Sequence, residues 1–331
     1  MRLKARSSHR LLFGLIVGVS LTAAAAANAA DWRGWNIHVE GYPNTVALDK
    51  FAELVTERTQ GRITPKNFHS GVLGSQPDAI EQVRVGALEY GNFNLGPMGP
   101  VVPEADVVNL PFIFKDLDHM YRVMRGPVGE EIGAAMAAKG LTPIAWYNSG
   151  ARSFYNSQRP ITTPDDVKGL KVRVMNNELF VGMIESMGGN ATPMAFGEVY
   201  QSIKTGVVDG AENNWQSFES TNHFEVAGFY SLSEHLIIPE CVCVNTGVWD
   251  ALSDEDKEIV KTAARESADL QLELWIKGDE ASRKKVVDGG VKFNEVADKA
   301  AFQKAMEPVY TKAIEVNPAL EALINKIKAV D

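Results

Sequence analysis

The N-terminal part of the chain alternates short extended segments with amphipathic helices. An extended segment over 35–39 precedes a helix whose N-cap lies at 44–45 and which ends at Gly61. The apolar residues on one face of this helix are Leu48, Phe51, Ala52 and Val55. A second helix over 77–86 leads into a strand over 88–95. The pattern therefore predicts a β-α-β-α-β unit.

A third helical pattern covers 118–138 and is interrupted at Gly126-Pro127, before a strand over 141–147. Later in the chain a long helix with a polar face follows the acidic cap at 253–256 and continues toward Lys285. Another helix follows Asp298. The C-terminal part of the chain is thus predominantly helical.

Between these regions the α/β pattern begins again. Residues 163–166 cap a short helix, and a strand over 170–174 leads into a helix over 178–187. A further strand over 192–195 and a helix over 197–205 repeat the theme. Two successive units of this kind predict two α/β lobes.

The length of the chain supports the same division. About 300 residues follow the first thirty, more than one hydrophobic core usually organises. No low-complexity linker separates the units, so we expect strands that cross between the lobes and act as a hinge. We assign 31–149 with 240–278 to the first lobe, and 150–239 with 279–331 to the second.

The first thirty residues have the pattern of a secretory signal. Four cations precede an apolar run over 11–27, and Ala27-Asn28-Ala29 offers small residues for cleavage. We expect a cleaved Sec-type signal and a periplasmic protein; the alternative is an uncleaved N-terminal anchor.

The charge of the chain limits its partners. Removing the four signal-region cations takes the formal charge from -9 to -13. An acidic surface argues against nucleic acid and anionic membranes, because both bind clustered cations. An anionic ligand would have to be held by a few local arginines.

The two cysteines, Cys241 and Cys243, lie in a predicted strand over 236–244. Residues two apart on a strand point to the same face, with Cα atoms near the upper limit for a disulfide. We therefore expect two small buried hydrophobic residues instead of a bridge, and no metal site, because no histidine pair stands nearby at ligand spacing.

Common catalytic motifs are missing from the sequence. It has no P-loop, no G-x-S-x-G elbow, no H-E-x-x-H and no G-x-G-x-x-G. We therefore expect a binding protein that uses no cofactor and no metal, and not an enzyme.

Three polar stretches carry the most information about a ligand. Residues 147–152 end a strand with Arg152, at the sheet edge where ligands bind. In 169–175, Val172 and Val174 share one face and Arg173 the other. The third stretch, 207–215, is a polar loop that ends in an aromatic residue.

Together with the helix over 196–206, these stretches resemble the substrate-binding components of tripartite ATP-independent periplasmic (TRAP) transporters. The similarity extends to Phe51-Ala52-Glu53-Leu54 and to 71–75, and so spans nearly the whole chain after the signal. The resemblance implies a two-lobed periplasmic binding protein with a central sheet in each lobe, hinge strands, and a long helix that crosses both lobes. It also implies a membrane permease driven by an ion gradient as the partner.

The resemblance assigns roles to three residues. It implies that Arg173 pairs with the ligand carboxylate and that Arg152 and Asn213 assist. A guanidinium suits this role because it presents a planar fork and stays charged. The other interpretations are a surface ion pair for Arg173, a tie between lobes for Arg152, and a turn residue for Asn213. At Asn214 and Trp215 the chain departs from the family, which often has a proline after the asparagine.

Other candidates lie at the predicted strand ends that face the cleft. The full set of candidate ligand-binding residues is Arg173, Arg152, Asn213, Glu40, His38, Asn94, Asn177, Asn214, Trp215, Phe196, His235 and Glu240.

This inventory favours a small organic acid with one carboxylate and many hydroxyls, a hexuronate or related sugar acid first. The amide side chains, His38 and Glu40 offer donors and acceptors for hydroxyls. A dicarboxylate would need more cations, and Glu40 would repel its second carboxylate. The alternatives are a C4-dicarboxylate or keto-acid binder, a periplasmic enzyme acting on sugar acids, and a sensory subunit. We expect a monomer that delivers its ligand to the TRAP permease and binds no nucleic acid.

Overall fold

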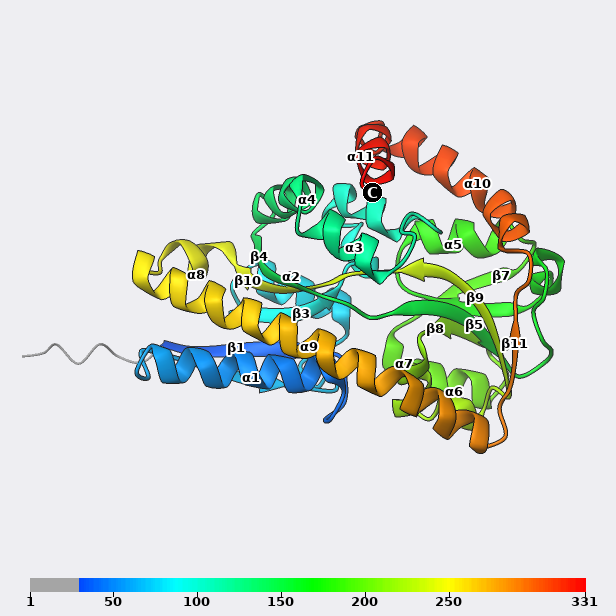
Figure 1. Cartoon of the computed structure of the whole chain (residues 1–331), viewed down its shortest axis with the longest axis horizontal. Helices are drawn as coiled ribbons and strands as arrows, with labels where there is room; N and C mark the ends of the chain where they lie inside the picture. The colour runs from blue at the N-terminus through cyan, green and yellow to red at the C-terminus, as the bar shows by residue number, and fades with distance from the viewer. Residues whose placement is uncertain (1–29) are drawn as a thin grey trace, which may run out of the picture.

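The computed structural model describes residues 30–331, and the expected signal peptide lies outside them except for Ala30. The chain forms two β-sheets, one in each of two lobes (Figure 1). The first sheet has the order β2-β1-β3-β10-β4, with β10 antiparallel to β3 and β4. Its strands are β1 (Ala30–Asn36), β2 (Ile63–Phe68), β3 (Tyr90–Asn94), β4 (Leu141–Tyr147) and β10 (Glu240–Asn245).

The second sheet has the order β11-β9-β5-β8-β6-β7. Its strands are β5 (Ala151–Asn156), β6 (Lys171–Val174), β7 (Asn190–Pro193), β8 (Gly210–Asn213), β9 (Phe229–Ile237) and β11 (Lys292–Glu295). In each sheet all strands but one follow one another along the chain. The remaining strand, β10 in the first sheet and β11 in the second, comes from a later part of the chain.

Helices cover both faces of each sheet. In the first lobe they are α1 (Pro43–Arg58), α2 (Gln76–Arg84), α3 (Leu117–Met124) and α4 (Pro127–Ala137), with the 3-10 turns η1 (Gly96–Met98) and η2 (Pro103–Asn109). In the second they are α5 (Glu178–Glu185), α6 (Val199–Lys204) and α7 (Trp215–Ser220), with η3 (Pro164–Val167), η4 (Phe196–Glu198) and η5 (His223–Glu225). The predicted interruption at Gly126-Pro127 separates α3 from α4, because Pro127 opens a new helix where its missing N–H costs nothing.

One long helix joins the lobes. After the short α8 (Thr246–Asp250), α9 (Asp254–Asp288) spans 35 residues, and Ser253 caps its N-terminus by accepting from the backbone N–H of Asp256. It packs on α1 and β4 in the first lobe and on α7 in the second (Figure 1). Where the chain passes beneath it, Gly150 has φ +61°, and a Cβ there would lie 2.6 Å from the Trp275 ring. Only glycine fits this position.

The chain also crosses between the sheets twice outside any helix or strand, at 148–150 and at 238–239. The single strand predicted over 236–244 is in fact two, β9 and β10, which belong to different sheets. Pro239 stands between them and has no N–H to continue a ladder. These segments and α9 are the connections through which the lobes could move.

The C-terminal helices are α10 (Lys299–Val316) and α11 (Ala319–Lys328). Helix α10 packs on α5 of the second lobe, but α11 packs on η2 and α4. The assignment of 279–331 to the second lobe stays a prediction, and apart from its contacts with α10, α11 packs on elements that precede residue 150.

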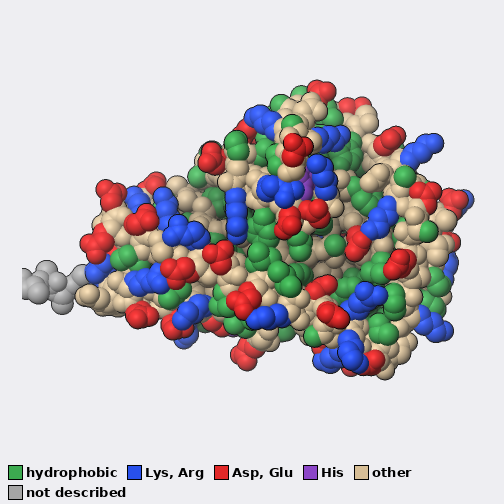
Figure 2. Space-filling view, in the orientation of Figure 1, with side chains coloured by type: hydrophobic (Ala, Val, Ile, Leu, Met, Phe, Trp, Pro, Cys, Tyr) green, Lys and Arg blue, Asp and Glu red, His purple; other side chains and the backbone are tan. Residues whose placement is uncertain are grey.

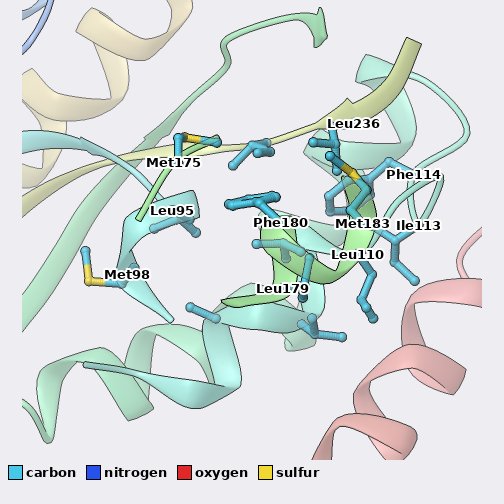
Figure 3. Close-up of a cluster of buried hydrophobic side chains, with 14 of the residues drawn as sticks. Leu95, Met98, Leu110, Ile113, Phe114, Met175, Leu179, Phe180, Met183 and Leu236 are labelled. Carbon is cyan, nitrogen blue, oxygen red and sulfur yellow. The ribbon is translucent and has the colours of Figure 1, made fainter. Parts of the chain in front are cut away.

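The largest hydrophobic core is shared by both lobes. Leu95, Met98 and Leu110 from the first lobe cluster with Phe180 and Met183 of α5 (Figure 3). Two smaller cores lie between α1, α9 and the first sheet and around α7 and β8 in the second lobe. Side chains of the two lobes thus pack against one another across the lobe boundary.

Cys241 and Cys243 form a disulfide, contrary to the sequence-based expectation. Their Cα atoms are 5.5 Å apart, inside the usual range for a bridge, whereas a fully extended strand would place them farther apart. Both residues are buried, as expected.

The surface carries mixed charge. Acidic and basic side chains are interspersed over the face shown in Figure 2. Within residues 30–331, no helix has the length and apolar character needed to cross a membrane, and no cluster of three or more His, Cys, Asp or Glu could hold a metal ion.

Candidate ligand-binding cleft

A pocket of about 580 Å³, partly open to solvent, lies between the two lobes. The first lobe and hinge contribute Ile37, His38, Gln76, Pro77, Asn94, Pro97, Ser149 and Glu240. The second contributes Arg152, Arg173, Met175, Asn176, Met194, Ala195, Phe196, Asn213, Asn214 and Ser217.

Arg173 is a buried cation without a carboxylate partner in the described part of the chain. Strand β6 points Val172 and Val174 into the hydrophobic core and Arg173 toward the pocket. Its Nε and one terminal nitrogen donate to the Met194 carbonyl at 3.0 and 2.8 Å. Burial lowers the pKa of Arg173 to about 10, so the group remains charged near pH 7. The rest of its fork is free for an anion.

Arg152 is equally buried, but its charge is already compensated. It donates to both carboxylate oxygens of Glu212, at 2.6 and 2.8 Å, and to Asn213 Oδ1 at 2.8 Å. Burial alone would lower the pKa of Arg152, but the Glu212 carboxylate outweighs this and holds the pKa above its ordinary value. Arg152 can therefore offer a hydrogen bond to a ligand, but the Arg152–Glu212 pair as a whole carries little net charge.

Three first-lobe side chains converge on Glu240. His38 Nε2 lies 3.1 and 3.2 Å from the two carboxylate oxygens. Asn44 donates to Oε2 at 2.7 Å, and Asn94 approaches Oε1 at 3.5 Å. The His38 ring stacks on Tyr42 at 4.0 Å between centroids, which fixes its orientation. This wall presents polar groups to the pocket in a defined geometry.

Several hydrogen bonds bridge the lobes around the pocket. The Tyr42 hydroxyl lies 3.0 Å from Ser217 Oγ, and Asn214 donates to the Ser149 carbonyl at 2.7 Å. The Tyr42–Ser217 contact joins the two lobes directly, whereas the Asn214–Ser149 bond is made at the crossing segment 148–150.

Comparison with known proteins identifies the family of the chain. Residues 36–316 match the family described as bacterial extracellular solute-binding protein, family 7 (DctP). The chain belongs to this family. A solute-binding protein of Chromohalobacter salexigens is 56% identical over 317 residues, 96% of this chain and 94% of that protein.

Solved structures of TRAP periplasmic solute-binding proteins are also similar. One from Roseobacter denitrificans, with bound β-D-glucuronate, is 65% identical with a TM-score of 0.90, covering 91% of this chain and 100% of that one. One from Sulfitobacter sp. NAS-14.1, with bound β-D-galacturonate, is 61% identical with a TM-score of 0.88, covering 89% and 98%. The expected fold class and TRAP-type solute-binding role are confirmed, and this solute-binding protein is not an enzyme.

Eight of the twelve residues predicted for the site of this solute-binding protein line the pocket. They are Arg173, Arg152, Asn213, His38, Asn94, Asn214, Phe196 and Glu240. They come from five strands or strand ends and the loops beside them, and the fold brings them to one space.

The other four lie elsewhere. Glu40 is exposed in the turn before α1, so it faces solvent. Asn177 caps α5 and donates to Gly96 O and Asp106 Oδ1 at 2.8 and 2.6 Å. Trp215 stacks on Tyr230 at 3.6 Å between centroids, in the second-lobe core.

His235 is the fourth; it is buried in β9 and does not line the pocket. It stacks on Phe154 at 4.2 Å between centroids, and burial lowers its pKa to about 3. Its Nε2 lies 4.0 Å from Glu212 and has no hydrogen-bond partner among residues 30–331.

Sequence reasoning missed several pocket residues. Gln76 donates to the Asn94 carbonyl at 2.7 Å and lines the first-lobe wall. Met175 and Asn176 follow β6 directly, so their position after Arg173 could have indicated them. Nothing in the local pattern pointed to Glu212 or Asn44 as partners of pocket residues.

Proposed function

We propose that this solute-binding protein captures a hexuronate, or a closely related sugar acid, and delivers it to TRAP permease subunits in the membrane. The observation that carries the proposal is Arg173, a buried cation of the pocket with no carboxylate partner among the described residues. A ligand carboxylate would complete its fork and remove the cost of leaving the charge unpaired in a dry cleft.

The rest of the pocket suits hydroxyl groups. Asn94, Asn213 and Asn214 offer amide donors and acceptors, and Ser149 and Ser217 offer hydroxyls. Arg152 is neutralised by Glu212, so Arg173 is the one arginine of the pocket left to pair with an anion. One carboxylate and several hydroxyls match this inventory better than two carboxylates do. The bound glucuronate and galacturonate of the similar proteins support the same class of ligand.

Membership of a family of bacterial extracellular solute-binding proteins supports a location outside the cytoplasmic membrane, which we propose to be the periplasm. A cleaved signal at the N-terminus and a monomeric state remain part of this proposal. Both can be checked on the exported protein by N-terminal sequencing and by light scattering.

Calorimetric titration of the exported protein tests the ligand class. D-Glucuronate and D-galacturonate should bind more tightly than succinate, malate or pyruvate, because only the sugar acids supply hydroxyls for the amide-rich wall. Tighter binding of succinate than of either uronate would overturn the sugar-acid assignment and leave the family role intact.

A further inference from the structure

The Glu240 carboxylate is the one acidic group that lines the pocket among the described residues. It stands at the start of β10, where its residue pairs with Asn94 on one side and Tyr147 on the other. It is 1% exposed. No Lys or Arg of residues 30–331 lies within salt-bridge distance of this carboxylate, and His38 is the one basic side chain of those residues that contacts it.

The contacts of Glu240 leave capacity for a ligand. A carboxylate has about four acceptor positions. His38 donates to both oxygens, Asn44 donates to Oε2, and the Asn94 contact to Oε1 is long at 3.5 Å. The His38 contacts need only an N–H donor at Nε2, which a neutral imidazole also supplies. They therefore do not require a positive charge opposite Glu240.

The other buried carboxylate near the pocket, that of Glu212, has an arginine partner. Glu212 is held by the bidentate pair with Arg152 and does not line the pocket. The pocket therefore has an uncompensated cation on the second lobe, Arg173, and an anion without an arginine or lysine partner on the first, Glu240. A ligand that contacts both lobes therefore meets a cation on the second lobe and an anion on the first.

We propose that Glu240 determines the specificity of the cleft for acids with a single carboxylate, by accepting from a hydroxyl at the far end of the ligand and repelling a second carboxylate there. This role rests on the proposed function, since it assumes a sugar acid whose carboxylate meets Arg173. It takes over the discrimination that the sequence suggested for Glu40, which is exposed.

Open-chain acids of equal length isolate this effect. D-Gluconate and D-glucarate are both acyclic, and they differ only in a hydroxymethyl or a carboxylate at one end. With one carboxylate on Arg173, only D-glucarate places a second charge toward Glu240. Two like charges about 6 Å apart at an effective dielectric constant of about 20 weaken binding roughly a hundredfold.

Calorimetric or competition titration of both acids gives the test. In the wild type, D-glucarate should bind roughly a hundredfold more weakly than D-gluconate. Glu240→Gln keeps the shape and one acceptor, so the ratio of the two Kd values should fall at least about tenfold. Glu198→Gln, which removes an exposed carboxylate next to Ala195 at the pocket edge, is the matched control and should change the ratio less than about threefold.

Two outcomes overturn the role of Glu240. One is a wild-type protein that binds D-glucarate within about threefold of D-gluconate, a result that does not depend on whether the variant folds. The other is a folded Glu240→Gln protein with an unchanged ratio. D-Glucuronate in the same series tests the proposed function separately. If D-glucuronate binds tightly but Glu240→Gln leaves the ratio of the D-glucarate and D-gluconate Kd values unchanged, only the role of Glu240 is overturned. If neither D-glucuronate nor D-gluconate binds, both proposals are overturned.

Discussion

Arg152 and Glu212 form a buried ion pair in which Nε donates to Oε2 at 2.6 Å and a terminal nitrogen donates to Oε1 at 2.8 Å. Glu212 thus compensates the positive charge of Arg152, which is one of the two arginines that line the pocket. Arg173, 3% exposed, donates instead to a backbone carbonyl. Two arginines of the same sheet thus have different electrostatic surroundings, because Arg152 is paired with a carboxylate and Arg173 is not.

The first prediction concerns Arg173 as the anchor of the carboxylate. In Arg173→Ala, uronate binding should weaken by about 3–5 kcal/mol, or roughly two to three and a half decades in Kd, because the ligand carboxylate is left buried and unpaired. Arg173→Lys should recover only part, since an ammonium keeps the charge and loses the planar fork. Calorimetry beside melting curves without ligand measures both effects. Binding of Arg173→Ala within about threefold of wild type would place the anchor elsewhere, with Arg152 the next candidate.

The second prediction concerns the stability of the Arg152–Glu212 pair. Glu212→Gln should lower the free energy of unfolding by about 3–5 kcal/mol, because Arg152 is left buried without a counter-charge. Replacing both residues, Arg152→Met with Glu212→Leu, should recover most of this loss. Urea unfolding without ligand is the measurement.

A surface pair provides the control for this stability effect. Arg58 and Glu266 are 2.7 Å apart, with the Glu266 side chain 45% exposed. Glu266→Gln should cost much less stability than Glu212→Gln does, because solvent screens an exposed ion pair. Equal losses from Glu212→Gln and Glu266→Gln would show that burial of the first pair has no energetic consequence.

The third prediction concerns lobe closure. The hydroxyl of Tyr42 reaches Ser217 of the other lobe at 3.0 Å. If ligand binding stabilises the closed state, Tyr42→Phe should weaken binding by about 0.5–1.5 kcal/mol, mainly through faster dissociation, and keep the stack on His38. Stopped-flow kinetics measures the rate.

Small-angle scattering tests the movement itself. Saturating ligand should decrease the radius of gyration of the wild type, since contacts from both lobes exist only when they close. An unchanged scattering profile would contradict a hinge mechanism.

The fourth prediction concerns pH and Asp279 of α9. Burial, with the Glu234 carboxylate nearby, raises the pKa of Asp279 to about 6, and Arg283 opposes the shift only in part. The folded state therefore binds a proton more tightly than the unfolded chain does, and stability is lost as pH rises from about 4 through 6. The effect is on the order of 3 kcal/mol.

Asp279→Asn should remove this dependence and stabilise the protein at pH 7 relative to wild type. Urea unfolding between pH 4 and 7 compares it with Glu280→Gln, an exposed neighbour on the same helix, which should keep the wild-type slope. A slope in Asp279→Asn equal to that of wild type would assign the pH dependence to other groups.

Local pattern predicted most of the secondary structure. The strand over 141–147 and the helix following Ser253 are where the pattern put them, because alternation and capping act over a few residues. The pattern over 236–244 gave one strand where there are two, because both β9 and β10 are extended and apolar and only the break at Pro239 separates them. Likewise, expectations for Cys241 and Cys243 assumed an ideal extended strand, and the actual Cα spacing is shorter.

The sequence by itself determined which face of β6 Arg173 occupies, since strand alternation puts it opposite Val172 and Val174, and the family resemblance indicated its role. Only the tertiary structure decided which other polar residues share its pocket. Glu40 and Glu240 were both candidates, and one is exposed in a turn while the other is buried between β3 and β4. The partners of Glu240, His38 and Asn44, are about 200 residues away in the chain. Electrostatics depends on distance in space and on burial, and a local pattern contains neither.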